Sequence, residues 1–259
     1  MGRLFVRLFK RSGAEVIICG REKWRAQRTA RMLHVKARSM TDLATADVVI
    51  VCVPIENTVK VCTDALRYMK DASLLIDISS VKSRIVDRIH RVVPLGIEYL
   101  SIHPLFGPNI RKLEDQNIIA IPSKPGRFSD EMIGFLNAMG FYVHICSAEE
   151  HDQIMSIVQV MHHYAYLVIA VQLARLMKLR RTMPKLVTRS LARTMNIIST
   201  FGDIEHTILS IQELNPYGLQ SRKSFAKLAS TMASMNARTK LDIKQAIRTI
   251  KKFQALDRA

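Results

Sequence analysis

The chain has 259 residues, of which 48% are hydrophobic and 24% charged, an ordinary balance for a globular protein that buries a sizeable core. Lys and Arg outnumber Asp and Glu by 39 to 22, and the net charge of +17 attracts anions of many kinds. Aromatic residues make up only 6%, and the cations are spread along predicted helices, which argues against a specific nucleic-acid-binding module. We expect no membrane span, because the longest apolar run, Ala165 to Leu176, is interrupted by Gln172 and Arg175.

Short apolar runs alternate with helical patterns over residues 1–148, which is typical of a mostly parallel sheet with helices on both faces. Enrichment in Val and Ile, with flanking Gly, Pro, Asp or Ser, predicts strands at 15–19, 48–53, 74–78, 99–102, 117–121 and 142–146. The intervening patterns predict helices at 2–12, 22–33, 57–69, 82–91 and 129–139. The predicted fold class is therefore α/β.

The character of the chain changes near residue 149, where apolar residues begin to recur at three- and four-residue spacing. This pattern predicts helices at 149–178, 184–201, 204–214, 217–235 and 239–255. The first of them is long for a globular domain, so we expect it to link two domains and to pack against a second chain. The predicted organisation is a sheet domain at 1–148 and an all-helical substrate and dimerisation domain at 149–259.

The first 19 residues match the second half of a dinucleotide-binding βαβ unit of the Rossmann type. Gly2 suits the third glycine of G-x-G-x-x-G, which allows close packing of helix and strand. The strand and two glycines that would precede it are not in this sequence, and that strand would lie between those at 15–19 and 48–53. We therefore expect a gap of roughly 9–10 Å with unpaired backbone on both sides. Either the true start lies upstream of Met1, or the chain is a degraded product that no longer cradles a pyrophosphate.

Residues after the next two strands are candidates for cofactor binding, together with Gly2. Arg21 follows the strand at 15–19, where it offers a planar cation to a ribose phosphate and favours NADP over NAD. The neighbouring Glu22 weakens this prediction, and a solvated surface arginine is the alternative. Val53 and Pro54 end the following strand, where the chain would pass the nicotinamide, although Pro54 can equally be a simple strand stop.

One histidine stands out at the carboxyl end of a predicted strand. His103 follows the apolar segment 98–102, and two prolines and a glycine then fix the loop. Ligands of open α/β sheets lie outside the carboxyl ends of the strands, and histidine transfers protons near neutral pH. Ser79 and Ser80 follow the neighbouring strand; either can cap the next helix, or Ser80 can help His103 to hold a substrate hydroxyl. The alternative for His103 is a side chain that merely ends a strand.

The long helix opens with Glu149-Glu150-His151-Asp152, and acids in a first turn are favoured by the helix dipole, so a structural role is predicted. His162 and His163 point about 100° apart, so at most one faces a given cleft. Their spacing from His151 gives no metal-ligand pattern, and no metal is predicted. The four cysteines form no C-x-x-C pair, which indicates small buried side chains in a reducing, cytoplasmic setting. They are Cys19, Cys52, Cys62 and Cys146.

Taken together, these residues resemble the prephenate dehydrogenase family, closest to its short archaeal members, without the first strand and the first two glycines of the dinucleotide loop. The likeness spans nearly the whole chain. It is carried by Gly2–Phe5, Val16–Arg21, Val53–Asn57, Asp77–Lys82, His103–Pro108, Glu150–Asp152, Val158–His163 and Ile211–Pro216. The combination of His103–Pro108 with Ser79–Lys82 is the most specific part.

The resemblance implies oxidative decarboxylation of prephenate, or of its amino analogue arogenate, with NADP or NAD in tyrosine biosynthesis. His103 would draw off the proton of the ring hydroxyl, Ser80 would orient that hydroxyl, and Ser79 and His163 would contribute to substrate binding. The family usually clamps a substrate carboxylate with an arginine of the helical domain. Ser199 stands where that arginine is expected, so Arg193 or Arg189 would have to reach in. Family members pair through the helical domain, which implies a homodimer.

Two other interpretations remain open. One is another NADP-dependent reductase with the same two-domain layout, of the imine or β-hydroxyacid type. Such enzymes typically use a lysine or aspartate on the long linking helix, where Asp152 is the candidate near its start. The other is a non-catalytic, truncated relative that survives as a dimeric or anion-binding protein.

Overall fold

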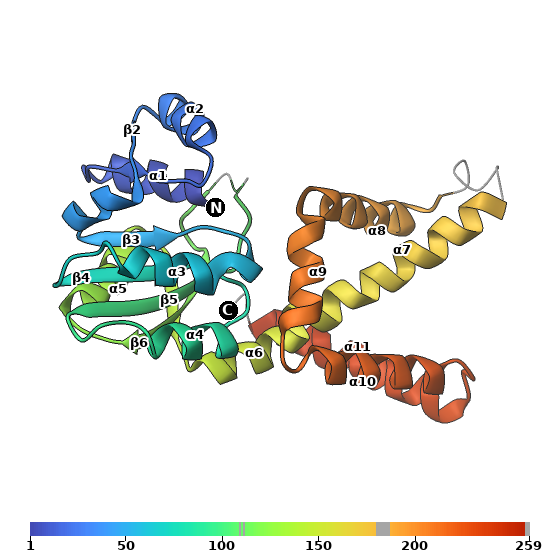
Figure 1. Cartoon of the computed structure of the whole chain (residues 1–259). Helices are drawn as coiled ribbons and strands as arrows, with labels where there is room; N and C mark the ends of the chain where they lie inside the picture. Colours follow the sequence, from blue (N-terminus) through green and yellow to red (C-terminus); the bar gives the residue numbers. More distant parts are fainter. Residues whose placement is uncertain (109, 111, 180–186, 257–259) are drawn as a thin grey trace. The chain divides into compact units, whose positions relative to one another are not determined.

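The computed structural model describes residues 1–108, 110, 112–179 and 187–256, and it divides into two units (Figure 1). The first unit consists of Met1–Met155 and Asp203–Pro216, and the second of Ser156–Gly202 and Tyr217–Ala259. The first unit thus takes in helix α6 (Ala148–Met155) and the later helix α9 (Glu205–Leu214). These two helices lie beyond the boundary that the sequence places after residue 148.

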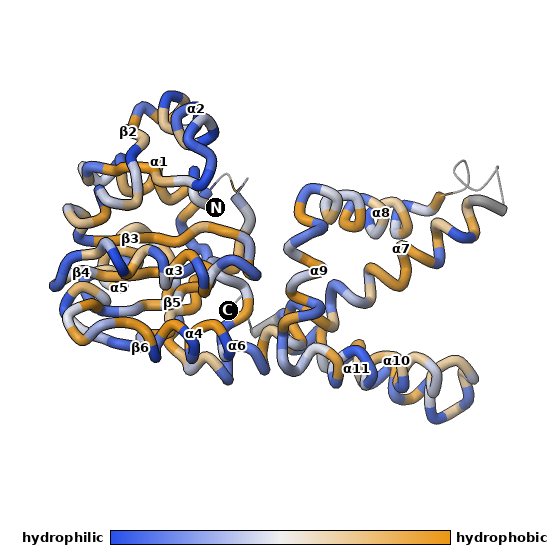
Figure 2. Tube along the Cα trace, in the orientation of Figure 1, coloured by the Kyte–Doolittle hydropathy of each residue, from blue (hydrophilic) through white to orange (hydrophobic). Residues whose placement is uncertain are grey.

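The first unit is built on a five-stranded sheet in sequence order. Its strands are β3 (Val48–Val51), β4 (Ser73–Asp77), β5 (Ile97–Pro104), β6 (Asn117–Lys124) and β7 (Tyr142–Ile145). All neighbouring pairs are parallel except β5 and β6. The predicted α/β class with a mostly parallel sheet is therefore confirmed. Figure 2 shows the strands β3, β4 and β5 mainly in hydrophobic colours, as expected for strands covered on both faces.

A second, two-stranded sheet joins β1 (Ile17–Ile18) to β2 (Lys36–Ala37). The sequence did not predict β2, because this short strand contains neither a β-branched nor an aromatic residue. In the described part of the chain β1 pairs with β2 and β3 pairs with β4, so the expected separation of β1 from β3 is present.

Helices cover both faces of the large sheet. On one face α1 (Gly2–Arg11) and α5 (Arg127–Ala138) share a core with alternate residues of β4, β5 and β6. That core contains Phe5, Leu8, Leu74, Ile76, Leu100, Ile102, Ile118, Ala120, Met132, Leu136 and Phe141. Helices α3 (Thr58–Leu66) and α4 (Ser83–His90) pack together on the other face (Figure 1). Because side chains alternate along a strand, the residues between those of the core point toward α3 and α4.

The connections of the first unit complete its outline. Helix α2 (Lys23–Leu33) joins β1 to β2. Short 3₁₀ turns lie at η1 (Met40–Thr45) and η2 (Ile55–Asn57). A third, η5 (Phe201–Ile204), begins in the second unit and ends in the first. The predicted helices of this half agree with the observed ones to within three residues at each end. The largest difference is at residues 67–69, because α3 ends at Leu66.

All secondary-structure elements in the described part of the second unit are helices. Its elements are a π-helical stretch at Ser156–Met161, α7 (His162–Leu179), α8 (Arg189–Thr200), α10 (Gly218–Met232) and α11 (Ala237–Leu256). The predicted start of a helix at 184 lies outside the described residues. The π-helical stretch contacts both α7 and α10. It breaks the single helix predicted at 149–178, and such stretches frequently accompany functional sites.

By length and composition alone, the helical stretch Ala148–Met177 is sufficient to cross a bilayer. A single stretch of this kind is weak evidence for a span, and it includes His151 and Asp152, which are fully buried and hydrogen-bonded within the first unit.

Candidate active site

His103 lies within β5 and not beyond its end. It is the seventh of the eight residues of the strand, opposite Ile119 of β6. By alternation its ring belongs to the face covered by α3 and α4, and it is only 3% exposed. The prediction that His103 follows the end of the strand is therefore corrected, because β5 continues through Pro104, and α6 supplies a partner for the buried ring.

That partner is His151, which forms a chain of hydrogen bonds with His103 and Asp152. His103 Nδ1 and His151 Nε2 are 2.8 Å apart, and the ring centroids are 5.0 Å apart. On the other side of the ring, His151 Nδ1 lies 2.8 Å from Asp152 Oδ1. Both α6 residues have fully buried side chains. The sequence predicted a structural role for them in a helical first turn and named Asp152 only as the candidate of the alternative reductase, so their contact with His103 was missed.

Asp152 also caps helix α4 from a distance in sequence. Its carboxylate accepts hydrogen bonds from the backbone of Lys82 at 2.9 Å and of Ser83 at 2.8 Å, and from the Ser83 hydroxyl at 2.5 Å. The prediction that Ser79 or Ser80 caps this helix is wrong, because the helix begins at Ser83 and the cap comes from α6.

A buried ion pair lies beside this chain. Lys82 Nζ, with no exposed surface, is 3.1 Å from Asp77 Oδ1 and donates to Ser101 Oγ and to the carbonyl of Ile102, both at 2.7 Å. Tyr99 donates its hydroxyl to Asp77 Oδ2 at 2.8 Å. The ammonium thus ties the ends of β4 and β5 together one residue before His103. The motif Asp77–Lys82 was visible in the sequence, but nothing in it showed that the lysine is buried.

The charges of these groups follow from their surroundings. Burial alone would raise the pKa of Asp152, but hydrogen bonds from His151, Ser83 and Lys82 outweigh it and lower the pKa. Burial lowers the pKa of His151 by more than Asp152 raises it. Burial, with the neighbouring His151 and Lys82, holds the pKa of His103 well below its usual value. At neutral pH Asp152 is therefore an ionised carboxylate, and His151 and His103 are neutral imidazoles.

Ser79 and Ser80 differ in what their side chains are free to do. Ser79 is buried, and its hydroxyl lies 2.5 Å from Asp77 Oδ1 and 2.9 Å from the carbonyl of Val81. These contacts hold the loop and leave the hydroxyl poorly suited to a substrate. Ser80 is half-buried, three residues beyond the end of β4. Because β4 and β5 are parallel neighbours with Asp77 opposite Ser101, Ser80 and His103 come from the same edge of the sheet.

The residues expected to hold a dinucleotide lie at the carboxyl ends of β1 and β3. A Cβ on Gly2 would stand 3.3 Å from Cys52 Cβ, so the first turn of α1 packs closely on the chain leaving β3. Val53 and Pro54 follow there, half-buried and exposed respectively. The Arg21 side chain is 92% exposed, 3.7 Å from Glu22. A helix N-terminus at this edge and an exposed guanidinium are donors that suit a phosphorylated dinucleotide.

The candidates from the helical half belong to the second unit and are described within it. His163 packs its ring edge-on against Phe201, with centroids 5.3 Å apart. Its Nδ1 is buried and has no hydrogen-bond partner among the described residues. Arg193 is exposed on α8, as is Ser199. Phe201 was not among the residues that the sequence singled out.

Comparison with known proteins gives two matches that bear on the family. Residues 5–123 match the model of the prephenate dehydrogenase nucleotide-binding domain. A probable arogenate/prephenate dehydrogenase of Methanocaldococcus jannaschii is 31% identical over 181 residues, which cover 68% of this chain and 41% of that protein. The chain belongs to the prephenate dehydrogenase family.

Two further comparisons concern a second curated relative and the fold. A T-protein of Haemophilus influenzae is 29% identical over 64% of this chain and 40% of its own length. The chain therefore spans about two fifths of the length of these curated relatives. The fold is that of an Aquifex aeolicus prephenate dehydrogenase, solved with hydroxyphenyl propionate and NAD+, with a TM-score of 0.76 at 15% identity over 100% of this chain and 95% of that one.

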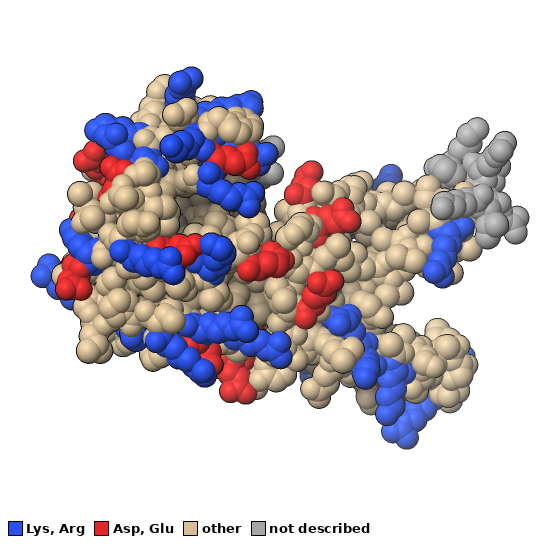
Figure 3. All heavy atoms as spheres, in the orientation of Figure 1, with Lys and Arg blue, Asp and Glu red and all other residues tan. Residues whose placement is uncertain are grey.

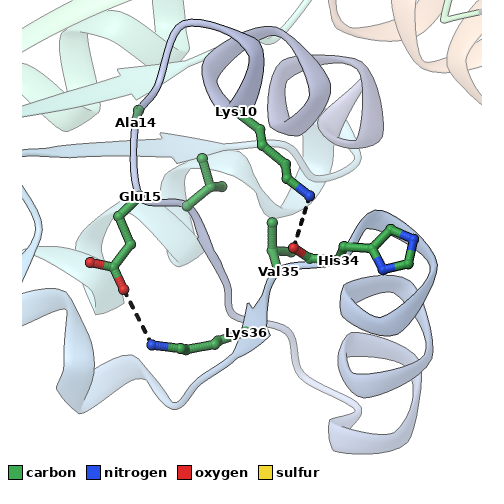
Figure 4. Close-up of a pocket in the computed structure, with 7 residues that line it drawn as sticks. Lys10, Ala14, Glu15, His34, Val35 and Lys36 are labelled. Atoms are coloured by element: carbon green, nitrogen blue, oxygen red, sulfur yellow. Dashed lines mark hydrogen bonds and ion pairs between the residues drawn. The ribbon is translucent and has the colours of Figure 1, made fainter.

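A hollow elsewhere in the first unit is not the site of this prephenate dehydrogenase family member. It is lined by residues at the amino-terminal side of β1 and β2, including Lys10, Glu15, His34 and Lys36 (Figure 4). Lys10 donates to the carbonyls of Leu33 and His34, and Lys36 pairs with Glu15 at 3.4 Å. The two lysines are thus already paired with protein groups. In addition, ligands of such sheets bind at the opposite, carboxyl ends of the strands.

The high positive charge does not form one continuous patch on the face shown in Figure 3. Lys and Arg are scattered over several elements there and are interleaved with Asp and Glu. This distribution is typical of solvated helix surfaces and gives no sign of a nucleic-acid groove.

Proposed function

We propose that the protein catalyses the oxidative decarboxylation of prephenate or arogenate in tyrosine biosynthesis, with a nicotinamide dinucleotide as oxidant. The observation that carries this proposal is the chain of Asp152, His151 and His103, in which a neutral imidazole sits near the carboxyl end of β5. Family membership supports the substrate class. It does not favour the imine or β-hydroxyacid reductase, nor the non-catalytic relative.

In this reaction His103 accepts the proton of the substrate ring hydroxyl, for which a neutral imidazole is the required state. Ser80 orients that hydroxyl from the end of the neighbouring strand. When bound, the dinucleotide supplies the hydride acceptor, and Gly2, Arg21, Val53 and Pro54 are the residues that would hold it. Loss of the ring carboxylate as carbon dioxide makes the ring aromatic and the step effectively irreversible.

The burial of His103 sets a condition on this proposal. At 3% exposure the ring meets a substrate only after the residues that cover it have moved. Binding of a substrate analogue must therefore change the NMR signals of the His103 ring, and analogue binding without such a change would contradict the proposal.

His163 and Arg193 are the proposed substrate ligands of the second unit. The imidazole of His163 has a buried Nδ1 in need of a partner, and Arg193 carries an exposed guanidinium that suits a carboxylate.

Activity is tested with the full chain, prephenate or arogenate, and NAD+ or NADP+, by following the reduced nucleotide and the product. Release of hydroxyphenylpyruvate identifies prephenate as the substrate, and release of tyrosine identifies arogenate. A folded protein that oxidises neither substrate with either nucleotide would contradict the proposed function.

We also propose a preference for NADP+, which rests on Arg21. Arg21→Ala should raise the KM for NADP+ about tenfold, the equivalent of roughly 1.4 kcal/mol, and change the KM for NAD+ less than about twofold. Arg25→Ala is the matched control, because Arg25 is already paired with Glu22 at 2.9 Å. Equal effects of Arg21→Ala on both nucleotides would remove the basis for the preference.

We propose that the protein is a cytoplasmic homodimer. The dimer is supported by exposed apolar side chains on α7 of the described chain. Val168 is 45% exposed, Ile169 39% and Val171 53%. Val171→Glu should halve the mass measured by sedimentation equilibrium, because a charge would be buried at the interface. Leu95→Glu, at a fully exposed position of the first unit, is the control. An unchanged mass for Val171→Glu would place the interface elsewhere.

A further inference from the structure

The chain of hydrogen bonds behind His103 determines which of its nitrogens carries the proton. Asp152 is ionised, and each of its oxygens accepts from groups that can only donate, namely two backbone N–H groups of α4. The contact at Asp152 Oδ1 therefore requires a proton on His151 Nδ1.

A neutral His151 with its proton on Nδ1 has a lone pair on Nε2. The atom 2.8 Å away, His103 Nδ1, must then be the donor. The reverse direction would need a doubly protonated His151, which burial and the neighbouring Lys82 disfavour. A neutral His103 with its proton on Nδ1 in turn has its lone pair on Nε2.

We propose that His151 and Asp152 are positioning residues that fix His103 in the tautomer whose Nε2 accepts a proton. The tautomer follows from this geometry together with the charges of the buried groups, whereas its catalytic use rests on the function proposed above. An imidazole locked this way presents a base without first losing a proton of its own.

The supports of Asp152 explain how the tautomer is held rigidly. Besides capping α4, Asp152 offers its backbone carbonyl to Asn215 Nδ2 at 3.0 Å. Asn215 is only 3% exposed and immediately follows α9. Asp152 is thus held through its carboxylate by the start of α4 and through its backbone carbonyl by the residue that follows α9, all within the first unit. This gives a physical role to the segment Ile211–Pro216, which the sequence singled out without a function.

The direct test is ¹⁵N NMR of the full-length protein with labelled histidine, which reports the protonation of each ring nitrogen. At neutral pH His103 and His151 should both carry the proton on Nδ1 and neither on Nε2. The charged groups around the two rings are Asp77, Lys82 and Asp152. Because these groups keep their charges near neutral pH, both histidines should keep the proton on Nδ1 throughout that pH range. A His103 with its proton on Nε2 would overturn the proposal, whatever the activity of the protein.

Two substitutions separate positioning from simple support of the fold. Gln at position 151 can present an amide oxygen to His103 Nδ1, whereas Leu cannot accept. We expect His151→Gln to keep the His103 tautomer and to retain kcat within about fivefold. His151→Leu should move the proton of His103 to Nε2 and lower kcat about 100-fold, with KM changed less than about threefold, in line with the contribution of a general base.

The outcomes also separate this inference from the proposed function. If the tautomers are as expected and no substrate is oxidised, the dehydrogenase function fails and the structural role of His151 stands. If the enzyme is active but His151→Leu keeps both the tautomer and kcat, the positioning role is wrong. If His151→Leu does not fold, the tautomer of His103 in the wild type and in His151→Gln still tests the positioning role.

Discussion

Replacement of His103 by Asn should lower kcat by about 10²- to 10⁴-fold, which is the usual contribution of a general base. The Asn amide can still donate to His151 Nε2, so the buried hydrogen bond is kept while the basic nitrogen is lost. The measurement is steady-state turnover with prephenate and arogenate. The KM for the nucleotide should stay within about twofold, because that ligand is held by other residues.

His90→Asn is the matched control, since His90 bonds to Ser123 at the surface, outside the proposed site. It should leave turnover unchanged. If His103→Asn keeps near-normal turnover while remaining folded, His103 is not the base, and the proposed mechanism fails.

Substitution of Lys82 by Met should reduce the free energy of unfolding by about 3–5 kcal/mol, because it leaves Asp77 as a buried, uncompensated charge. Urea denaturation at neutral pH measures this loss. The double variant Asp77→Asn/Lys82→Met should recover part of it, since no net charge then remains buried at this position. Lys60→Met removes an exposed ion pair with Asp64 and should have little effect.

The stability loss caused by Lys82→Met should depend on pH, and its direction of change can be predicted. In the wild type the pKa of Asp77 is lowered: burial alone would raise it, but Lys82 and hydrogen bonds from Ser101 and Ser79 outweigh that effect. The stabilisation by Asp77 is therefore complete above about pH 4 and is lost as the pH falls through its folded pKa. Without Lys82, burial raises this pKa, so the deficit of Lys82→Met should shrink as the pH approaches 4. A deficit independent of pH would show that lost packing, and not the unpaired carboxylate, is its cause.

The order of elements in the first unit was predictable because strands and helices leave different spacings of apolar residues. The runs at 48–53 and 74–78 are rich in Val and Ile, and both became strands of the large sheet. Strand β2 was missed because its pairing depends on the neighbouring backbone of β1. The π-helical stretch at Ser156–Met161 was missed as well, since a short π-helical turn inside a helix has no residue pattern of its own in the sequence.

The sequence by itself determined the α/β class and the change to helices near residue 149, and it singled out His103 and the segment Asp77–Lys82 as candidates for the chemistry. These features are local: they depend on periodicity and on residue types next to strand ends. Only the tertiary structure showed that Asp152 caps α4 across 69 residues, that Lys82 is buried against Asp77, and that His151 contacts His103. Such contacts join residues far apart in the chain, and no spacing within one segment reveals a partner that the fold brings from another.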